Sequence, residues 1–101
     1  MQAGGGRTVE FTLLVRAYCN LCDEMRAALA PLAAARNATI RLIDVDAEPA
    51  LEAAWGDLVP VLFIGEPAPG AELCHYHLDR ARVEAALREY AAEVPSQPKM
   101  R

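Results

Sequence analysis

The chain has 101 residues, of which 53% are hydrophobic and 24% charged, and its formal net charge is −4. This composition predicts one globular domain with a core of its own and argues against a disordered chain. The acidic balance argues against nucleic-acid binding, and no apolar stretch is long enough to cross a membrane or to act as a signal peptide.

The first half of the chain predicts a strand, a helix and a second strand. Residues 1–7 include three consecutive glycines, which are costly to order, so we expect a flexible lead-in. The apolar run at 11–15 predicts a buried strand, and residues 39–45 alternate as a second strand does. Between them a helix is expected over 20–36, and Pro31 should kink it or end it early. The apolar residues on one face of this helix are Leu21, Met25, Leu29 and Leu32.

The second half predicts a short helix, two strands and a final helix. The short helix is expected over 46–55, and a strand over 59–64 follows it. After a turn rich in glycine and proline, residues 71–76 predict a fourth strand. Asp79 is expected to cap the last helix, and the tail at 95–101 should be flexible. The apolar residues on one face of the last helix are Val83, Ala86, Leu87, Tyr90 and Val94.

The predicted order of elements is β-α-β-α-β-β-α, within one domain at residues 8–94. A helical crossover joins the first two strands, so they should be parallel and the connection right-handed. The last two strands should form an antiparallel hairpin. The sequence therefore predicts an α/β fold with a four-stranded mixed sheet flanked by helices.

Two cysteines, Cys19 and Cys22, lie where the first strand gives way to the first helix. Unpaired N–H groups at a helix N-terminus stabilise an anion, and a thiolate formed there can attack a disulfide. Arg16 favours that thiolate, whereas Asp23 and Glu24 oppose it. We predict that Cys19 is the nucleophile, with a moderately lowered pKa, and that Cys22 is the resolving thiol.

Other interpretations of the cysteines remain open at this point. They could be inert apolar side chains, ligands of a structural zinc ion, or ligands of an iron–sulfur cluster shared between two chains. The candidate zinc ligands are Cys19, Cys22, Cys74 and either His75 or His77. Taken alone, Cys74 is expected to be a structural strand residue, with a third redox thiol as the functional alternative, and the two histidines are expected at the surface.

The sequence resembles the thioredoxin superfamily, and within it the small glutaredoxin-like proteins of bacteria. The resemblance runs from about Thr8 to Val94 and is carried by three segments. These are Tyr18-Cys19-Asn20-Leu21-Cys22-Asp23-Glu24-Met25, Trp55-Gly56-Asp57-Leu58-Val59-Pro60-Val61-Leu62, and Leu78-Asp79. The resemblance implies a thioredoxin-like fold and thiol–disulfide chemistry.

The resemblance also implies roles for three residues outside the cysteine pair. Pro60 should follow a cis peptide bond and face the cysteines, and the backbone of Val59 should pair with an incoming substrate strand. Arg16 matches a basic residue that glutaredoxins place near the glutathione carboxylate. The chain departs from the family in having Cys-Asn-Leu-Cys as its motif and no Gly-Gly turn after the fourth strand. It also lacks the buried acid of thioredoxins in its first strand, and only Asp79 remains of the acidic pair beside the glutathione site.

The sequence therefore predicts a small cytoplasmic thiol–disulfide oxidoreductase that acts as a monomer. Its expected partners are disulfide-containing proteins or small thiols, with a thiol reductase or glutathione returning it to the reduced state. No cofactor is expected, and glutathione is a candidate co-substrate. The rival functions are a metal-binding module and a non-catalytic protein-binding module that keeps the fold but not the chemistry.

Overall fold

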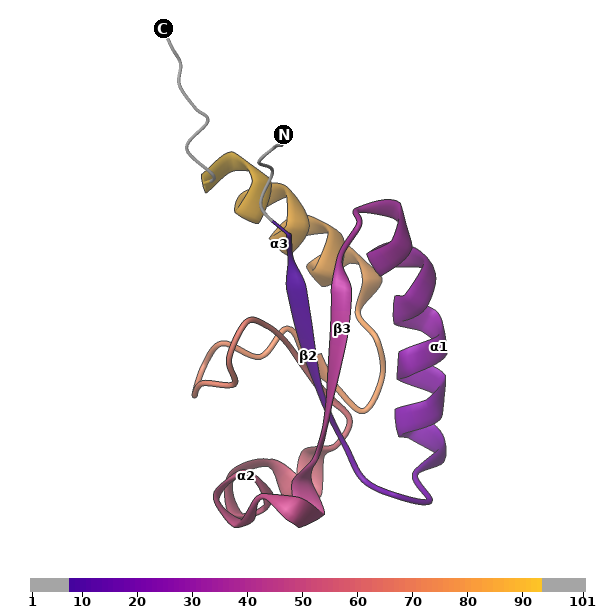
Figure 1. Cartoon of the computed structure of the whole chain (residues 1–101), viewed down its shortest axis with the longest axis vertical. Helices are drawn as coiled ribbons and strands as arrows, with labels where there is room; N and C mark the ends of the chain where they lie inside the picture. Colours follow the sequence, from indigo (N-terminus) through magenta and orange to yellow (C-terminus); the bar gives the residue numbers. More distant parts are fainter. Residues whose placement is uncertain (1–7, 94–101) are drawn as a thin grey trace, which may run out of the picture.

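The computed structural model of the protein describes residues 8–93 and places a central sheet among helices (Figure 1). The elements in chain order are β2 (Glu10–Val15), α1 (Asn20–Ala35), β3 (Thr39–Asp44), the 3-10 helix η1 (Val45–Ala47), α2 (Pro49–Trp55), the 3-10 helix η2 (Gly56–Leu58), β4 (Val61–Ile64), β5 (Cys74–His75) and α3 (Arg80–Glu93). This order confirms the predicted succession of strands and helices. The flexible ends predicted at 1–7 and 95–101, and the place of Val94 on the last helix, lie outside the described residues.

The four strands form one mixed sheet in the order β3-β2-β4-β5. β2 and β3 are parallel, as the helical crossover predicts, and β4 is antiparallel to both β2 and β5. The register places Val15 opposite Asp44 and Leu14 opposite Val61. The C-terminal ends of β2 and β3 and the N-terminal end of β4 therefore meet at one edge of the sheet.

The two faces of the sheet are covered by different helices, because side chains alternate between faces along each strand. On one face, Phe11 and Leu13 pack with Met25 and Leu29 of α1 and with side chains of α3. On the other, Leu14 packs in a second cluster that includes side chains of α2. Figure 1 shows α2 at the same end of the sheet as the connection from β2 to α1.

The helix predictions hold with small changes. The buried face of α1 consists of Cys22, Met25, Leu29 and Ala33. Met25 and Leu29 were predicted on it, whereas the predicted Leu21 and Leu32 are only half-buried, Leu32 packing against the core. Asp79 caps α3 as predicted, because its carboxylate accepts a hydrogen bond from the Arg82 N–H at 3.0 Å. None of the helices within residues 8–93 combines the length and the apolar character that a membrane crossing requires.

Three predictions about element length need correction. Helix α1 runs through Pro31 to Ala35, so the early end did not occur, and burial of Ala33 on the sheet offsets the lost backbone hydrogen bond. The fourth strand covers only Cys74–His75 instead of 71–76. It begins three residues later than predicted, and it ends one residue earlier, where Tyr76 has a φ of 64° and turns the chain away from the sheet. The short helix is divided into η1 and α2, with Asp44 accepting a hydrogen bond from Asp46 N–H at 2.9 Å.

Candidate functional site

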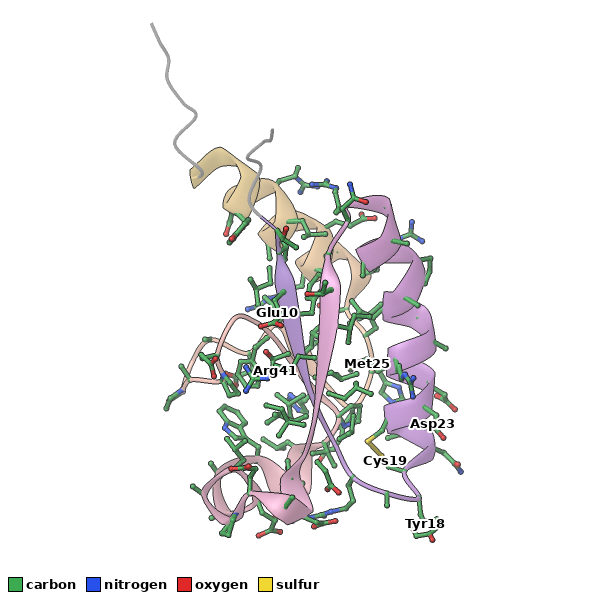
Figure 2. All side chains as sticks on the ribbon, in the orientation of Figure 1. Glu10, Tyr18, Cys19, Asp23, Met25 and Arg41 are labelled. Atoms are coloured by element: carbon green, nitrogen blue, oxygen red, sulfur yellow. A yellow bond between two sulfur atoms is a disulfide. The ribbon has the colours of Figure 1, made fainter. Side chains whose placement is uncertain are left out.

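Cys19 and Cys22 lie together at the N-terminus of α1, as their spacing predicts. Cys19 is the N-cap residue, with an extended backbone, and its Sγ accepts a hydrogen bond from the Cys22 N–H at 3.1 Å. The two Cα atoms are 5.2 Å apart and the sulfur atoms lie at disulfide distance. Figure 2 shows Cys19 where the chain enters α1. A disulfide between the two sulfurs can therefore form and break without movement of the backbone.

The two cysteines differ in how far solvent reaches them. Cys22 is 3% exposed and lies on the buried face of α1, whereas Cys19 is half-buried and borders the surface. Tyr18, which precedes the pair, has a φ of 58° and a fully exposed side chain at the turn into the helix (Figure 2). A partner disulfide approaching from solvent therefore meets Cys19 first.

The helix terminus supplies the electrostatic environment of Cys19. Backbone N–H groups of the first turn point toward the cap, and the one on Cys22 is aimed at the Cys19 sulfur. The positive end of the helix dipole favours a negative sulfur at this position. Asp23 lies in the same first turn with an exposed side chain, so its carboxylate opposes that effect under solvent screening.

The segment with Val59 and Pro60 leads into β4 at the end of the sheet where the cysteine loop begins. The Val59–Pro60 peptide bond is cis, Pro60 is buried and Val59 is half-buried. Because Leu14 pairs with Val61, the residue before β4 lies beside the end of β2. The topology thus brings the segment before β4 and the loop after β2 to one end of the sheet.

Arg16 lies in an ion-pair cluster with residues of η1 and α2. Its Nη2 lies 3.0 Å from Asp46 Oδ1 and 3.0 Å from Glu52 Oε2. Its Nε and Nη1 donate to the Asp46 carboxylate and to the Gly56 carbonyl oxygen, at 3.2 and 3.3 Å. The hydrogen bonds to Asp46 and Glu52 raise the pKa of Arg16. Contact between Arg16 and a glutathione carboxylate stays a prediction.

The partners of Arg16 were not predicted from the sequence. Asp46 could have been found from the topology, because parallel pairing of β2 and β3 places the residues after Val15 beside those after Asp44. Gly56 could not, because a carbonyl acceptor has no signal in the sequence. The cluster is a product of the register and of the way α2 packs back onto the sheet.

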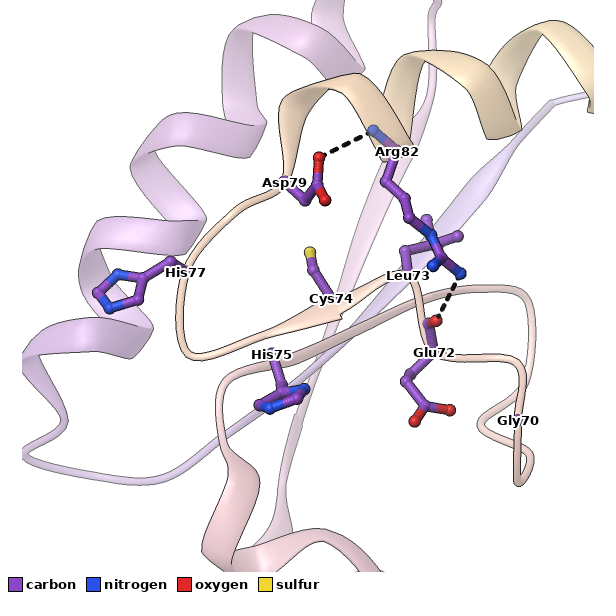
Figure 3. A pocket seen from close by; sticks show the side chains of 8 residues that line it. All are labelled: Gly70, Glu72, Leu73, Cys74, His75, His77, Asp79 and Arg82. Carbon is purple, nitrogen blue, oxygen red and sulfur yellow. Dashed lines mark hydrogen bonds between the residues drawn. The ribbon is translucent and has the colours of Figure 1, made fainter.

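A second feature of the molecule is a hollow of about 490 Å³ near the start of α3 (Figure 3). Its lining includes Cys74, His75, His77, Asp79 and Arg82, and neither Cys19 nor Cys22 belongs to it. Burial raises the pKa of the Cys74 thiol and is the largest effect on it. Three smaller effects act on the same pKa: the Asp79 N–H and the charge of Arg82 lower it, and the charge of the Asp79 carboxylate raises it. A half-buried thiol of raised pKa is a poor nucleophile at neutral pH.

The zinc interpretation receives no support from the geometry. Within residues 8–93, no three histidine, cysteine or acidic side chains lie close enough to hold a metal ion. Cys19 and Cys22 are paired with each other, and Cys74 is a free thiol in the hollow beside α3. The predicted zinc ligands are therefore not brought together.

Comparison with known proteins gives a family match over most of the chain. A family model described as "Glutaredoxin-like domain (DUF836)" matches residues 10–88. No curated protein compared with the chain matches it.

Several solved structures are similar to the chain. Protein Ne2328 from Nitrosomonas europaea is 31% identical with a TM-score of 0.69, and the match covers 82% of this chain and 95% of that one. Protein XcR50 from X. campestris is 36% identical with a TM-score of 0.58, over 78% of this chain and 96% of that one. Thioredoxin 1 from Thermosipho africanus TCF52B is 17% identical with a TM-score of 0.56, over 82% and 94% of the two chains, and this similarity shows the fold alone.

Proposed function

Because the chain belongs to the glutaredoxin-like family within the thioredoxin superfamily, we propose that it is a thiol–disulfide oxidoreductase acting through Cys19 and Cys22. The observation that carries this proposal is the unequal placement of the two sulfurs. Cys19 caps α1 and borders solvent, while Cys22 is covered and lies at disulfide distance from it. An accessible nucleophile beside a sheltered second thiol is the arrangement that two-step disulfide exchange requires.

The first step is attack by the Cys19 thiolate on one sulfur of a substrate disulfide. The substrate S–S bond breaks, a new bond joins Cys19 to one half of the substrate, and the other half leaves as a thiolate that takes up a proton. The Cys22 N–H hydrogen bond and the helix dipole stabilise the attacking anion before the reaction. Cys19 therefore becomes the site of the mixed disulfide.

In the second step, Cys22 loses its proton and attacks the Cys19 sulfur. The mixed disulfide breaks, the second half of the substrate leaves as a thiol, and the Cys19–Cys22 disulfide forms. The substrate has then gained two electrons and two protons, and the cysteine pair has lost them. Two molecules of glutathione, or a thiol reductase, return the pair to the dithiol in the reverse sense.

The proposed substrate contacts lie at the same end of the sheet. The backbone of Val59 is proposed to pair with an extended segment of the substrate, and Pro60 to border the sulfur pair. Two observations support this: Val59 is half-buried rather than packed in the core, and β4 starts beside the end of β2. We further propose that the substrates are disulfide-containing proteins or small disulfides of the cytoplasm, and that the protein acts as a monomer.

Trapping the mixed disulfide tests the proposal. The Cys22→Ser variant lacks the resolving thiol, so incubation with bis(2-hydroxyethyl) disulfide should add one substrate half to Cys19, detected by mass spectrometry of the intact protein and of the Cys19 peptide. The Cys19→Ser variant should form no comparable adduct, and Cys74→Ser should behave as the wild type. An adduct that forms on Cys74, or a Cys19 that reacts no faster than a small free thiol at pH 7, would favour the non-catalytic binding module instead.

A further inference from the structure

One guanidinium joins the two segments that form the proposed active site. Arg16 precedes Cys19 by three residues, and the carbonyl it contacts belongs to Gly56, which precedes Val59 by three residues. Asp46 and Glu52, its other partners, belong to η1 and α2, the elements between β3 and that segment. Arg16 therefore contacts the connection that leads from β3 to Pro60 at three points, one each in η1, α2 and η2.

We propose that Arg16 is a positioning residue, which holds the Cys19 loop against the segment that leads to Val59 and Pro60, rather than a receptor for a substrate carboxylate. This inference rests on the proposed thiol–disulfide function, and it concerns the contacts that fix the geometry of that active site. A single exposed ion pair contributes little to the stability of a contact between two segments. Here, however, one planar guanidinium contacts two carboxylates and a carbonyl oxygen at once. Losing the guanidinium would remove all three contacts at once.

The partners of Arg16 leave it little capacity for an anionic substrate. Three of the five N–H donors of the guanidinium are already hydrogen-bonded, one each on Nε, Nη1 and Nη2, and Nη2 also lies 3.0 Å from Asp46 Oδ1. With one cation and two carboxylates, the cluster is net negative, so it repels a further carboxylate. A substrate anion would first have to displace Asp46 or Glu52.

The tightness of the cluster also shows at Gly56. A Cβ added to this residue would lie 2.7 Å from Glu52 Oε2 and 3.2 Å from Arg16 Nη2. The backbone of Gly56 has a φ of −56°, so any residue could adopt it, and space alone favours glycine here. Gly56→Ala would push the Glu52 carboxylate away from Arg16 without changing any charge.

The test measures the reactivity of Cys19 in a Cys22→Ser background, with four changes that affect the cluster differently. Arg16→Gln removes the cation, the Asp46→Asn and Glu52→Gln pair removes the anions, Gly56→Ala displaces one contact, and Arg16→Lys keeps charge but not the planar fork. Arg41→Gln is the matched control, because Arg41 makes an exposed 3.0 Å ion pair with Glu66 outside the cluster. Two rates are followed by mass spectrometry of the Cys19 peptide: alkylation by iodoacetamide, and mixed-disulfide formation with a neutral and with an anionic disulfide.

If Arg16 is a positioning residue, all four changes slow both reactions of Cys19 in the same direction. A loss of roughly tenfold is expected, within the range that small misplacements of reacting groups cause. Arg16→Lys should not restore the rate, neutral and anionic disulfides should be affected alike, and Arg41→Gln should leave both rates unchanged.

If Arg16 binds substrate instead, removing the cation and removing the carboxylates should change the rate in opposite directions, and this result would overturn the inference. Arg16→Gln would then slow only the anionic disulfide, and removing the two carboxylates would speed it up. Equal rates for all variants would overturn it as well. Failure of the proposed function would give another result. In the Cys22→Ser protein with its cluster intact, Cys19 would then form mixed disulfides no faster than a free thiol, while the alkylation rates of the variants would still test the positioning role.

Discussion

The side-chain hydroxyl of Tyr76 donates a hydrogen bond to the carbonyl oxygen of Asp57 at 2.9 Å. The backbone N–H of the same residue donates to the Pro60 carbonyl oxygen, also at 2.9 Å. Tyr76 thus contacts both ends of the segment that contains Val59, from the side of β5, while Arg16 holds Gly56 from the side of β2. The segment proposed to receive the substrate is therefore fixed by two residues distant in sequence.

Replacing Tyr76 by Phe removes the hydroxyl contact and keeps the ring. Because the side chain is 40% exposed, the loss of one neutral hydrogen bond should lower the free energy of unfolding by only about 0.5–1 kcal/mol. Urea denaturation of both proteins measures it. Tyr18→Phe is the matched control, since the Tyr18 side chain is fully exposed, and it should be neutral. A Tyr76→Phe protein as stable as the wild type would show that the contact to Asp57 contributes nothing.

Ionisation of Cys74 should weaken the fold at alkaline pH. Burial raises the pKa of this thiol above its ordinary value of 9.0, so the folded chain keeps the proton at a pH where the unfolded chain has lost it. The stabilisation that Cys74 contributes is therefore complete below about pH 9 and is lost as pH rises through the folded pKa.

The comparison of wild type with Cys74→Ala isolates this effect from other alkaline titrations. With the Cys19–Cys22 disulfide intact, the difference between their free energies of unfolding should shrink as pH increases from about 8 to about 10.5. Denaturation series at several pH values provide the measurement. A difference that stays constant or grows with pH would contradict the raised pKa.

Leu29 tests how strongly α1 depends on the core beneath it. The side chain is fully buried and packs with Met25 and with residues of β2 and α3. Leu29→Ala should lower the free energy of unfolding by about 2–5 kcal/mol, because it removes buried methyl groups and leaves a cavity. Leu42, which is 42% exposed on β3, gives the matched control, and Leu42→Ala should cost about 0.5 kcal/mol. Similar losses for the two leucines would mean that α1 is not seated as described.

Thr12 carries a buried hydroxyl that finds no hydrogen-bond partner among the described residues. Valine has the same shape without the polar atom, so Thr12→Val should be neutral or stabilising by about 1 kcal/mol. Thr39→Val, at an exposed position of β3, is the control and should change little. Thermal or urea denaturation distinguishes the cases, and a clear destabilisation by Thr12→Val alone would show that the hydroxyl is bonded after all.

The elements that hydrophobic periodicity predicted well are those whose signal is local. Strand β2 and helix α1 begin within one residue of their predicted starts, and of the predicted apolar face of α1 Met25 and Leu29 are buried in the core. The fourth strand was predicted too long at both ends: residues 71–73 do not join the sheet as a strand, and the positive φ of Tyr76 ends the strand at His75. Helix α1 continues beyond Pro31 because tertiary burial of Ala33 outweighs a local penalty.

The sequence by itself determined the order of the elements and the place of Cys19 and Cys22 at the start of a helix. Both follow from neighbours a few residues apart, since periodicity and a three-residue spacing are local properties. Only the tertiary structure decided what surrounds that pair. Arg16 meets Asp46 and Gly56 across 30 and 40 residues, and Tyr76 meets Asp57 across 19. Such contacts depend on strand register and on how α2 packs, which arise only when distant segments share one sheet.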